Sequence, residues 1–160
     1  MCSQRGFTLL EVLIVMLLVA LTATIVTLNF RHDLDQVVEN EARRFAALMN
    51  QLCQESIIQS KVFATTEDGA TGYRFVVLTN DGWKPLTGDD LFRPRSLPED
   101  INIELALNNS IPRTDKKVYL QCGPDGVLPV FSALFSTDGI RYLVETNERQ
   151  ELQISLETTE

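Results

Sequence analysis

Glu11 is the one acidic residue inside a long apolar segment, so its position is the first feature that suggests a chemical role. The 19 residues from Val12 to Phe30 carry no formal charge. As a helix rising ~1.5 Å per residue they would extend ~28 Å, close to the ~30 Å hydrocarbon core of a bilayer. A carboxylate at full depth costs ~2.5–3.5 kcal/mol or more, so acids in such segments are rare and usually functional. Glu11 is therefore the leading candidate site residue, and an acid tolerated near the membrane surface is the plainer alternative.

The sequence offers no catalytic constellation. Its single histidine, His32, lies two residues after the apolar segment, where it is badly placed for a Ser/His/Asp or Cys/His arrangement. The chain also lacks a glycine-rich phosphate loop and a paired-histidine helix motif. We therefore expect that the protein is not an enzyme and needs no cofactor.

Three pairs of acidic residues could supply oxygen ligands to Ca²⁺, which takes six to eight of them. These pairs are Glu67-Asp68, Asp89-Asp90 and Glu99-Asp100. None has the alternating spacing of a dedicated calcium loop, so we interpret them as solvated turns and predict no metal site.

Two cysteines, Cys53 and Cys122, allow two interpretations. They do not form a CxxC pair, and one histidine is too few for a recognisable zinc site. A disulfide between them is possible if this part of the chain lies outside the cytoplasm. Alternatively, Cys53 is a free thiol packed on the apolar face of a helix, where a thiol behaves as a small hydrophobe.

The composition limits the classes of partner that the protein can be expected to bind. Of its 160 residues, 44% are hydrophobic and 22% charged, which is ordinary for a globular protein with an apolar segment. Residues 31–160 hold 21 acidic and 13 basic residues and are numerous enough for one core. Non-specific nucleic-acid binding draws its affinity from clustered Lys and Arg, so we expect no nucleic-acid partner.

One long helix is expected at the start of the chain, because no Pro or Gly interrupts Phe7 to Ser60. The second half of this helix has an apolar stripe at three- and four-residue spacing, which predicts one face packed on a core. A hinge near Arg31–Asp33 remains the alternative, because polar residues cluster there. The stripe consists of Leu34, Val38, Ala42, Phe45, Met49, Leu52 and Ser56.

From Lys61 onward the pattern changes toward the two-residue period of strands. Asn80-Asp81-Gly82 is a hairpin-type turn, Pro85 indicates an edge strand, and Thr87–Glu99 is expected to be a loop. A helix followed by short antiparallel strands predicts an α+β fold, with the long N-terminal helix packed on a C-terminal antiparallel sheet. The predicted strands are Tyr73–Thr79, Trp83–Leu86, Ile101–Leu107, Lys117–Cys122, Pro129–Phe135, Ile140–Glu145 and Leu152–Leu156.

The stretch Arg5-Gly6-Phe7-Thr8-Leu9-Leu10-Glu11, opening onto the apolar helix, resembles the leader junction of type IV pilins and type II secretion pseudopilins. The resemblance implies that a prepilin peptidase cuts after Gly6 and methylates the new terminal amine of Phe7. It also implies an assembly role for Glu11, the fifth mature residue. A secretory signal peptide cut near Ala20–Thr24 fits less well, because the apolar run continues to Phe30.

The spacing of these residues makes the implied role physically reasonable. Phe7 and Glu11 are four residues apart, so they lie on one helical face about one turn apart. If a second helix is staggered, the Glu11 carboxylate of one subunit meets the Phe7 amine of its neighbour, and each charge gains a partner in lipid. Buried ion pairs contribute little net stability but can fix register, which a helical filament needs.

Residues further along the chain resemble the H-type minor pseudopilins of type II secretion systems. They are Phe45, Leu48, Leu52 and Glu55, then Tyr73-Arg74-Phe75, then Trp83-Lys84-Pro85-Leu86. The late turn Ser136–Gly139 departs from the common family form, since the proline that often follows it is missing. The match is dense only in the first 30 residues.

This resemblance implies a domain plan and a function. Residues 1–6 would be the cleaved leader, 7–30 the transmembrane and assembly half of the helix, and 31–160 a periplasmic head, with helix 31–60 and a β-rich part 61–160. The protein would be a structural subunit near the tip of the pseudopilus, anchored in the inner membrane, and would support export of folded proteins across the outer membrane. Its partners would be other major and minor pseudopilins and the prepilin peptidase.

Two other functions remain open. A minor pilin of a type IV pilus, acting in assembly initiation or DNA uptake, has a similar head, although the acidic composition disfavours DNA uptake. A membrane-anchored binding module that never assembles is disfavoured by the junction at Gly6, Phe7 and Glu11.

Overall fold

The computed structural model describes residues 9–69, 71–98, 100–107 and 117–157, and for residues 22–33 the backbone alone. The chain divides into two compact units, Met1–Gln36 and Val37–Glu160. This division lies six residues after the boundary expected at 30/31.

The helix α1 extends from Leu9 to Gln59 without a break, so it continues through Arg31–Asp33, where a hinge had been the alternative. In the first unit, the described side chains from Leu9 to Leu21 are exposed. Within the described residues, no helix is both long and apolar enough to cross a membrane. Of the expected transmembrane half, residues 7 and 8 and the side chains of 22–30 lie outside the described residues.

In the second unit, the apolar stripe of α1 is the face that packs on the core. Val38, Ala42, Phe45, Met49 and Leu52 are fully buried, as the three- and four-residue spacing predicts. Leu34, the first member of the predicted stripe, belongs to the other unit and is 40% exposed.

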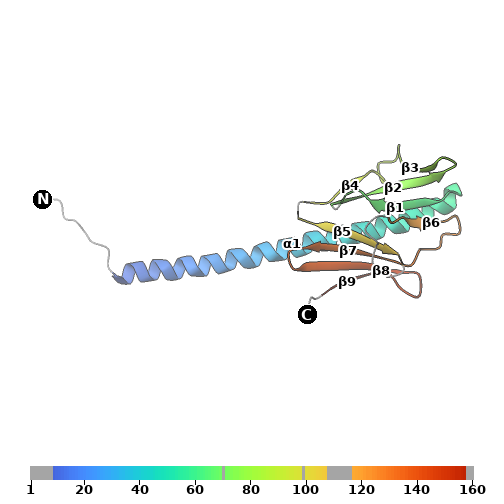
Figure 1. Ribbon diagram of the computed structural model, residues 1–160. Helices are drawn as coiled ribbons and strands as arrows, with labels where there is room; N and C mark the ends of the chain where they lie inside the picture. Colours follow the sequence, from blue (N-terminus) through green and yellow to red (C-terminus); the bar gives the residue numbers. More distant parts are fainter. Residues whose placement is uncertain (1–8, 70, 99, 108–116, 158–160) are drawn as a thin grey trace. The chain divides into compact units, whose positions relative to one another are not determined.

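Two antiparallel sheets form the rest of this unit (Figure 1). The first contains β1 (Phe63–Glu67), β2 (Gly72–Thr79), β3 (Gly82–Pro85), β4 (Arg95–Ser96) and β6 (Leu120–Cys122). Its order is β3-β2-β1-β6, and β4 also pairs with β2. The second contains β5 (Asn102–Leu107), β7 (Phe131–Thr137), β8 (Ile140–Thr146) and β9 (Leu152–Leu156), in the order β5-β7-β8-β9.

Phe45 joins α1 to both sheets. Its ring lies edge-on to Tyr73 of β2 at 5.1 Å between centroids and to Phe135 of β7 at 5.5 Å. Tyr73 in turn contacts Phe75, and Phe75 contacts Phe92, so the aromatic core continues along the first sheet. Edge-to-face contacts at these distances are the favoured geometry for aromatic pairs. The helix and the two sheets therefore share one core, which confirms the α+β class, although with two sheets where one was expected.

A second aromatic contact lies on the opposite face of the first sheet. Trp83 and Tyr119 stack at 5.0 Å between centroids, with their ring planes 9° apart. The strand register puts Trp83, Val76 and Ala64 on this face, away from Tyr73 and Phe75. We attribute the burial of Val76 and Ala64 to the cover that the stacked rings provide.

Two strands differ from the prediction, and each has a physical reason. The first four residues of β1 are all buried because both faces of that strand are covered, so the two-residue alternation is missing. The two-residue strand β4 lies within the expected loop Thr87–Glu99, where Arg95 and Ser96 pair with Tyr73 and Gly72. Gly72 permits this approach, since a Cβ there would lie 2.7 Å from the Arg95 carbonyl oxygen.

Candidate functional site

Glu11 lies in the first turn of α1. The amide groups at the start of a helix carry partial positive charge, which favours a carboxylate in this position. Gly6 and Phe7, the other two residues of the expected processing and assembly site, lie outside the described residues. The structure therefore positions Glu11 alone of these three.

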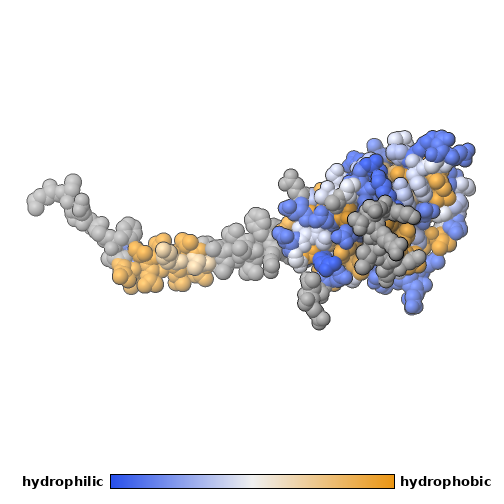
Figure 2. All heavy atoms as spheres, viewed as in Figure 1, coloured by the Kyte–Doolittle hydropathy of each residue, from blue (hydrophilic) through white to orange (hydrophobic). Residues whose placement is uncertain are grey.

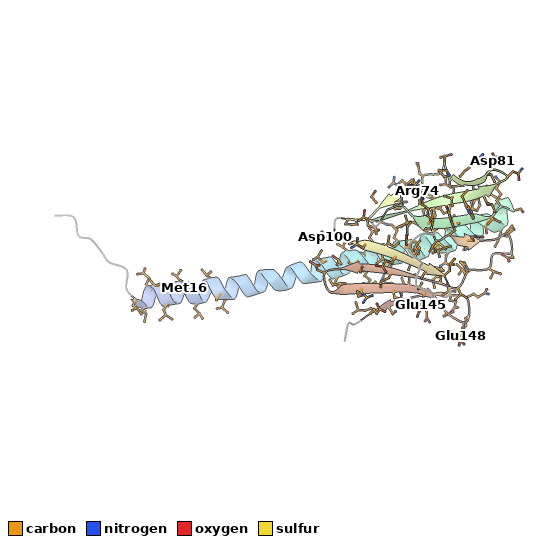
Figure 3. The ribbon with its side chains drawn as sticks, in the orientation of Figure 1. Met16, Arg74, Asp81, Asp100, Glu145 and Glu148 are labelled. Carbon is orange, nitrogen blue, oxygen red and sulfur yellow. A yellow bond between two sulfur atoms is a disulfide. The ribbon has the colours of Figure 1, made fainter. Side chains whose placement is uncertain are left out.

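Large apolar side chains surround Glu11 on every side of the helix. Leu9, Leu13 and Met16 are 81%, 63% and 68% exposed, and Met16 projects outward from α1 (Figure 3). Figure 2 shows the side chains of this stretch as an apolar surface. Soluble monomers rarely expose contiguous apolar patches larger than a few hundred Å², so this surface calls for an apolar environment such as lipid or neighbouring helices.

Cys53 of α1 and Cys122 of β6 form a disulfide in the structure, with their Cα atoms 4.9 Å apart. Both residues are buried, so the bond lies inside the core. The sequence had left a free thiol at Cys53 as the alternative. The bond connects the C-terminal part of α1 to the outer strand of the first sheet, across 69 positions of sequence.

The end of α1 is fixed further by the loop that follows β6. The Ser56 hydroxyl lies 2.7 Å from the carbonyl oxygens of both Cys53 and Gly123, which compete for its one proton. Gly126 has φ +71°, and a Cβ there would come within 2.5 Å of Ile57 Cδ1. The loop therefore packs closely on the last turns of the helix, and neither contact could be expected from the local sequence pattern.

Glu41 is a second finding that the sequence did not provide. It is not part of the apolar stripe predicted for α1, yet it is 8% exposed and its carboxylate accepts a hydrogen bond from Arg44 Nη1 at 2.8 Å. Its position three residues after Val38 and four before Phe45 could have indicated the core face. An acid in an otherwise apolar stripe is the pattern to look for.

Tyr73, near Glu41, is a buried tyrosine whose hydroxyl has no hydrogen-bond partner among the described residues. Burial, and secondarily the Glu41 carboxylate, raise the pKa of Tyr73 to about 12, although Arg95 and Arg44 oppose the shift. Tyr73 therefore keeps its proton throughout the physiological range. A tyrosine with this pKa is a poor general base or nucleophile.

The acidic pairs take part in structural contacts. Glu67 Oε1 accepts a hydrogen bond of 2.8 Å from the Leu105 amide, which connects the two sheets, and Asp68 pairs with Arg74. Asp89 Oδ1 accepts from the Leu91 amide at 2.8 Å.

Asp89 and Asp90 also line a shallow surface cavity of about 340 Å³ together with the cationic Arg93. Glu99 lies outside the described residues. In the part of the chain that the structure describes, no three His, Cys, Asp or Glu side chains are grouped to hold a metal ion.

Known proteins match both the N-terminal segment and most of the length of the chain. Residues 1–27 match the prokaryotic N-terminal methylation motif. The type II secretion system protein H of Aeromonas hydrophila is 32% identical over 124 residues, which cover 76% of this chain and 68% of that protein. The protein of the same name from Vibrio cholerae serotype O1 is 28% identical over 121 residues, covering 74% of this chain and 62% of that protein.

Two solved structures of the minor pseudopilin EpsH from the type II secretion system of Vibrio cholerae have the same fold. One has a TM-score of 0.65 at 18% identity and covers 79% of this chain and 99% of its own. The other has a TM-score of 0.60 at 20% identity and covers 74% and 96%. Both matches rest on fold rather than on sequence. The names of these relatives refer to type II secretion, and none of them refers to a type IV pilus.

Proposed function

The chain belongs to the type II secretion system protein H family, and from this premise we propose that it is a minor pseudopilin. In this proposal it is a structural subunit near the tip of the type II secretion pseudopilus and supports export of folded proteins across the outer membrane. The proposal rests on the observation that one helix, α1, has an exposed apolar part and a part that packs on the core. Its first turn holds Glu11 inside an apolar surface, and its face from Val38 to Ser56 forms the core of the head.

The same proposal includes processing and location. A prepilin peptidase removes Met1–Gly6 and methylates the amine of Phe7, and the methylation motif over residues 1–27 supports this step. Residues 7–30 are inserted in the inner membrane, and the head lies in the periplasm. The Cys53–Cys122 disulfide supports a periplasmic head, because disulfides persist in oxidising compartments.

The proposed role is structural rather than enzymatic. The polar groups of the described head contribute to packing and to contacts between its elements, as with Ser56, Glu67 and Asp89. The proposed partners are other major and minor pseudopilins, the prepilin peptidase and the inner membrane. The exposed apolar surface from Leu9 to Leu21 supports assembly with neighbouring helices in lipid.

Deletion and complementation in the native host test this function. Deleting the gene should stop export of a type II secretion substrate, and the full chain supplied in trans should restore it. Twitching motility and DNA uptake are measured in the same strains. Normal export in the deletion strain, or a defect confined to motility or DNA uptake, would contradict the proposal and favour a type IV pilus.

A further inference from the structure

The strand β9 ends the second sheet and has one edge to which no described strand is bound. The Asn147 amide donates to the Glu151 carbonyl at 2.9 Å, and the Glu157 amide donates to the Arg141 carbonyl at 2.8 Å. In an antiparallel ladder the bonded positions alternate, so the odd-numbered residues of β9 face β8. The backbone groups of Leu152, Ile154 and Leu156 therefore point away from the sheet.

The other outer strands of the described sheets are blunted. In β3 the Leu86 amide donates to the Phe75 carbonyl, so Trp83 and Pro85 face outward, and Pro85 has no N–H to donate. In β5 the outward amide of Leu105 already donates to Glu67. The remaining outer strands are short, since β6 has three residues and β4 has two. Short strands, prolines and side-chain caps are common means by which proteins protect sheet edges.

In contrast, β9 has none of these protections among the residues that the structure describes. Its five residues, Leu152–Leu156, include no proline and no charged side chain. Leu152 and Ile154 pack against the core, whereas Leu156 is 55% exposed at the end of the strand. Asn147 stabilises the turn before β9, because its Oδ1 accepts hydrogen bonds from the amides of Arg149 and Glu151 at 2.8 and 2.9 Å. The edge is thus preformed and available for pairing.

We propose that this edge of β9 binds an extended segment of another pseudopilin, which adds a strand to the second sheet. The inference rests on the proposed function, since it takes the partner from the same filament. Main-chain hydrogen bonds to Leu152, Ile154 and Leu156 would supply the affinity, as in other cases of strand addition.

The charges beside β9 disfavour a second copy of this chain as the occupant. Antiparallel pairing of two β9 strands about Ile154 would put Glu151 of each opposite Glu157 of the other. Like charges directly opposite each other are destabilising. Arg141 lies 3.2 Å from Glu157 and offsets one of the two charges, which leaves each end of the pairing net negative.

The same charges indicate which residues the partner strand should carry. A lysine or arginine opposite Glu151 would meet its carboxylate, and Glu148 projects from the adjoining turn (Figure 3). At this end of β9 a shallow cavity of about 370 Å³ is lined by Asn147, Glu148, Arg149, Glu151 and Gln153. We therefore expect an apolar, extended segment that carries a basic residue at this end.

Hydrogen exchange resolved by residue tests the pairing. The full-length protein, purified in detergent, is mixed in turn with each of the other pseudopilins of the same secretion system. With one of them, exchange at the amides of Leu152, Ile154 and Leu156 should slow by about tenfold or more, because exchange then requires opening of the added ladder. Gln153 and Ser155 already face β8 and serve as internal controls. Lack of protection with every pseudopilin, or protection that appears when this protein alone is concentrated, would overturn the proposal.

A pair of variants at Leu156 separates backbone pairing from side-chain contact. Leu156→Pro removes an outward N–H without breaking the ladder to β8, whereas Leu156→Ala keeps this N–H and removes the exposed side chain. The proline variant should weaken binding by about tenfold or more, and the alanine variant should bind nearly as the unmodified protein does. Equal losses in both variants at unchanged Tm would overturn the proposal.

Should Leu156→Pro lower the Tm, Glu151→Lys tests the same strand by reversing the charge that the partner's basic residue meets. It should weaken binding in low salt, and unchanged binding would count against the proposal. The secretion assay separates the two proposals. If Leu156→Pro restores export as well as the unmodified chain does, strand addition is wrong and the pseudopilin function remains.

Discussion

Among single residues, Tyr73 lies in an environment that makes ionisation of its hydroxyl costly. Its hydroxyl is buried in the core between α1 and β2, beside the Glu41 carboxylate, and its pKa is raised to about 12. In the unfolded chain the same group titrates near 10, so the folded state holds the proton more tightly. The stability that this group contributes is complete below pH 10 and is lost as the pH rises from 10 to about 12.

This linkage predicts a difference between the native chain and Tyr73→Phe. Between pH 9 and pH 12 the native chain should lose roughly 2 kcal/mol more stability than the variant, because each pKa unit is worth about 1.4 kcal/mol and at pH 12 the folded group is only half ionised. At pH 7 the variant should be as stable or slightly more so, because it removes a buried hydroxyl without a described partner. Denaturant melts of both proteins across this pH range measure the difference. Parallel losses would contradict the assigned environment of Tyr73.

A second prediction at this scale concerns the start of the mature chain. If the junction at Gly6 and Phe7 is processed as proposed, the membrane-extracted protein should begin at an N-methylated Phe7. Intact-mass and terminal-peptide mass spectrometry distinguish this form from the others. A Gly6→Val variant should keep residues 1–6, because the peptidase would lose its cleavage residue. An intact Met1 in the native chain, or a start near Thr24, would contradict the processing step.

Among the elements, α1 and the first sheet depend on the bond between Cys53 and Cys122. A cross-link that closes a loop of this size stabilises the fold by about 4 kcal/mol in the chain-entropy model, and native disulfides typically contribute about 2–5 kcal/mol. The double variant Cys53→Ala/Cys122→Ala should therefore unfold at a much lower denaturant concentration. Reductant should destabilise the native chain and leave the double variant unaffected. Equal midpoints for the oxidised native chain and the double variant would argue against the bond.

The elements also indicate which parts of the fold are readable from sequence. The helix was predictable because its period is long, no Gly or Pro interrupts it, and its stripe from Val38 to Leu52 is buried as expected. β5 was predictable because Ile103 and Leu105 are buried while Asn102 and Glu104 face solvent. β1 was not, since the outer face of its sheet is covered by the Trp83–Tyr119 stack, a contact between residues 36 positions apart. The division into two sheets depends on such distant contacts, which no local pattern encodes.

The candidate site shows the same limit. Glu11 could be chosen as a candidate from the sequence because an acid in an apolar run is locally anomalous, and its assembly role stays a prediction. The sequence could not decide whether Cys53 and Cys122 form a disulfide, because the distance between them depends on where the short strand β6 joins its sheet. The contacts of Ser56 and the open edge of β9 depend likewise on tertiary pairing.

On the scale of the whole molecule, the protein combines a segment of exposed apolar side chains with a folded head in one chain. Most of the described surface of the first unit consists of large apolar side chains, whereas the second unit encloses its own core. The first unit therefore depends on surroundings that this chain does not itself provide. In the proposed function, lipid and the helices of neighbouring subunits provide them, and Glu11 sets the position of one helix against the next.

This role of Glu11 predicts a separation of insertion from assembly. Glu11→Ala should leave cleavage and membrane insertion intact, since it replaces a costly acid by an apolar residue. Assembly should fail, because the Phe7 amine of the neighbouring subunit would then be an unpaired charge in lipid, at a cost of several kcal/mol. Glu11→Gln keeps the side-chain length and one hydrogen bond but removes the charge, so we expect a smaller loss. Crosslinking to co-expressed pseudopilins in membranes, measured beside export, gives the result. Normal crosslinks with Glu11→Ala would mean that Glu11 is an acid tolerated at the membrane surface and that another contact sets the register.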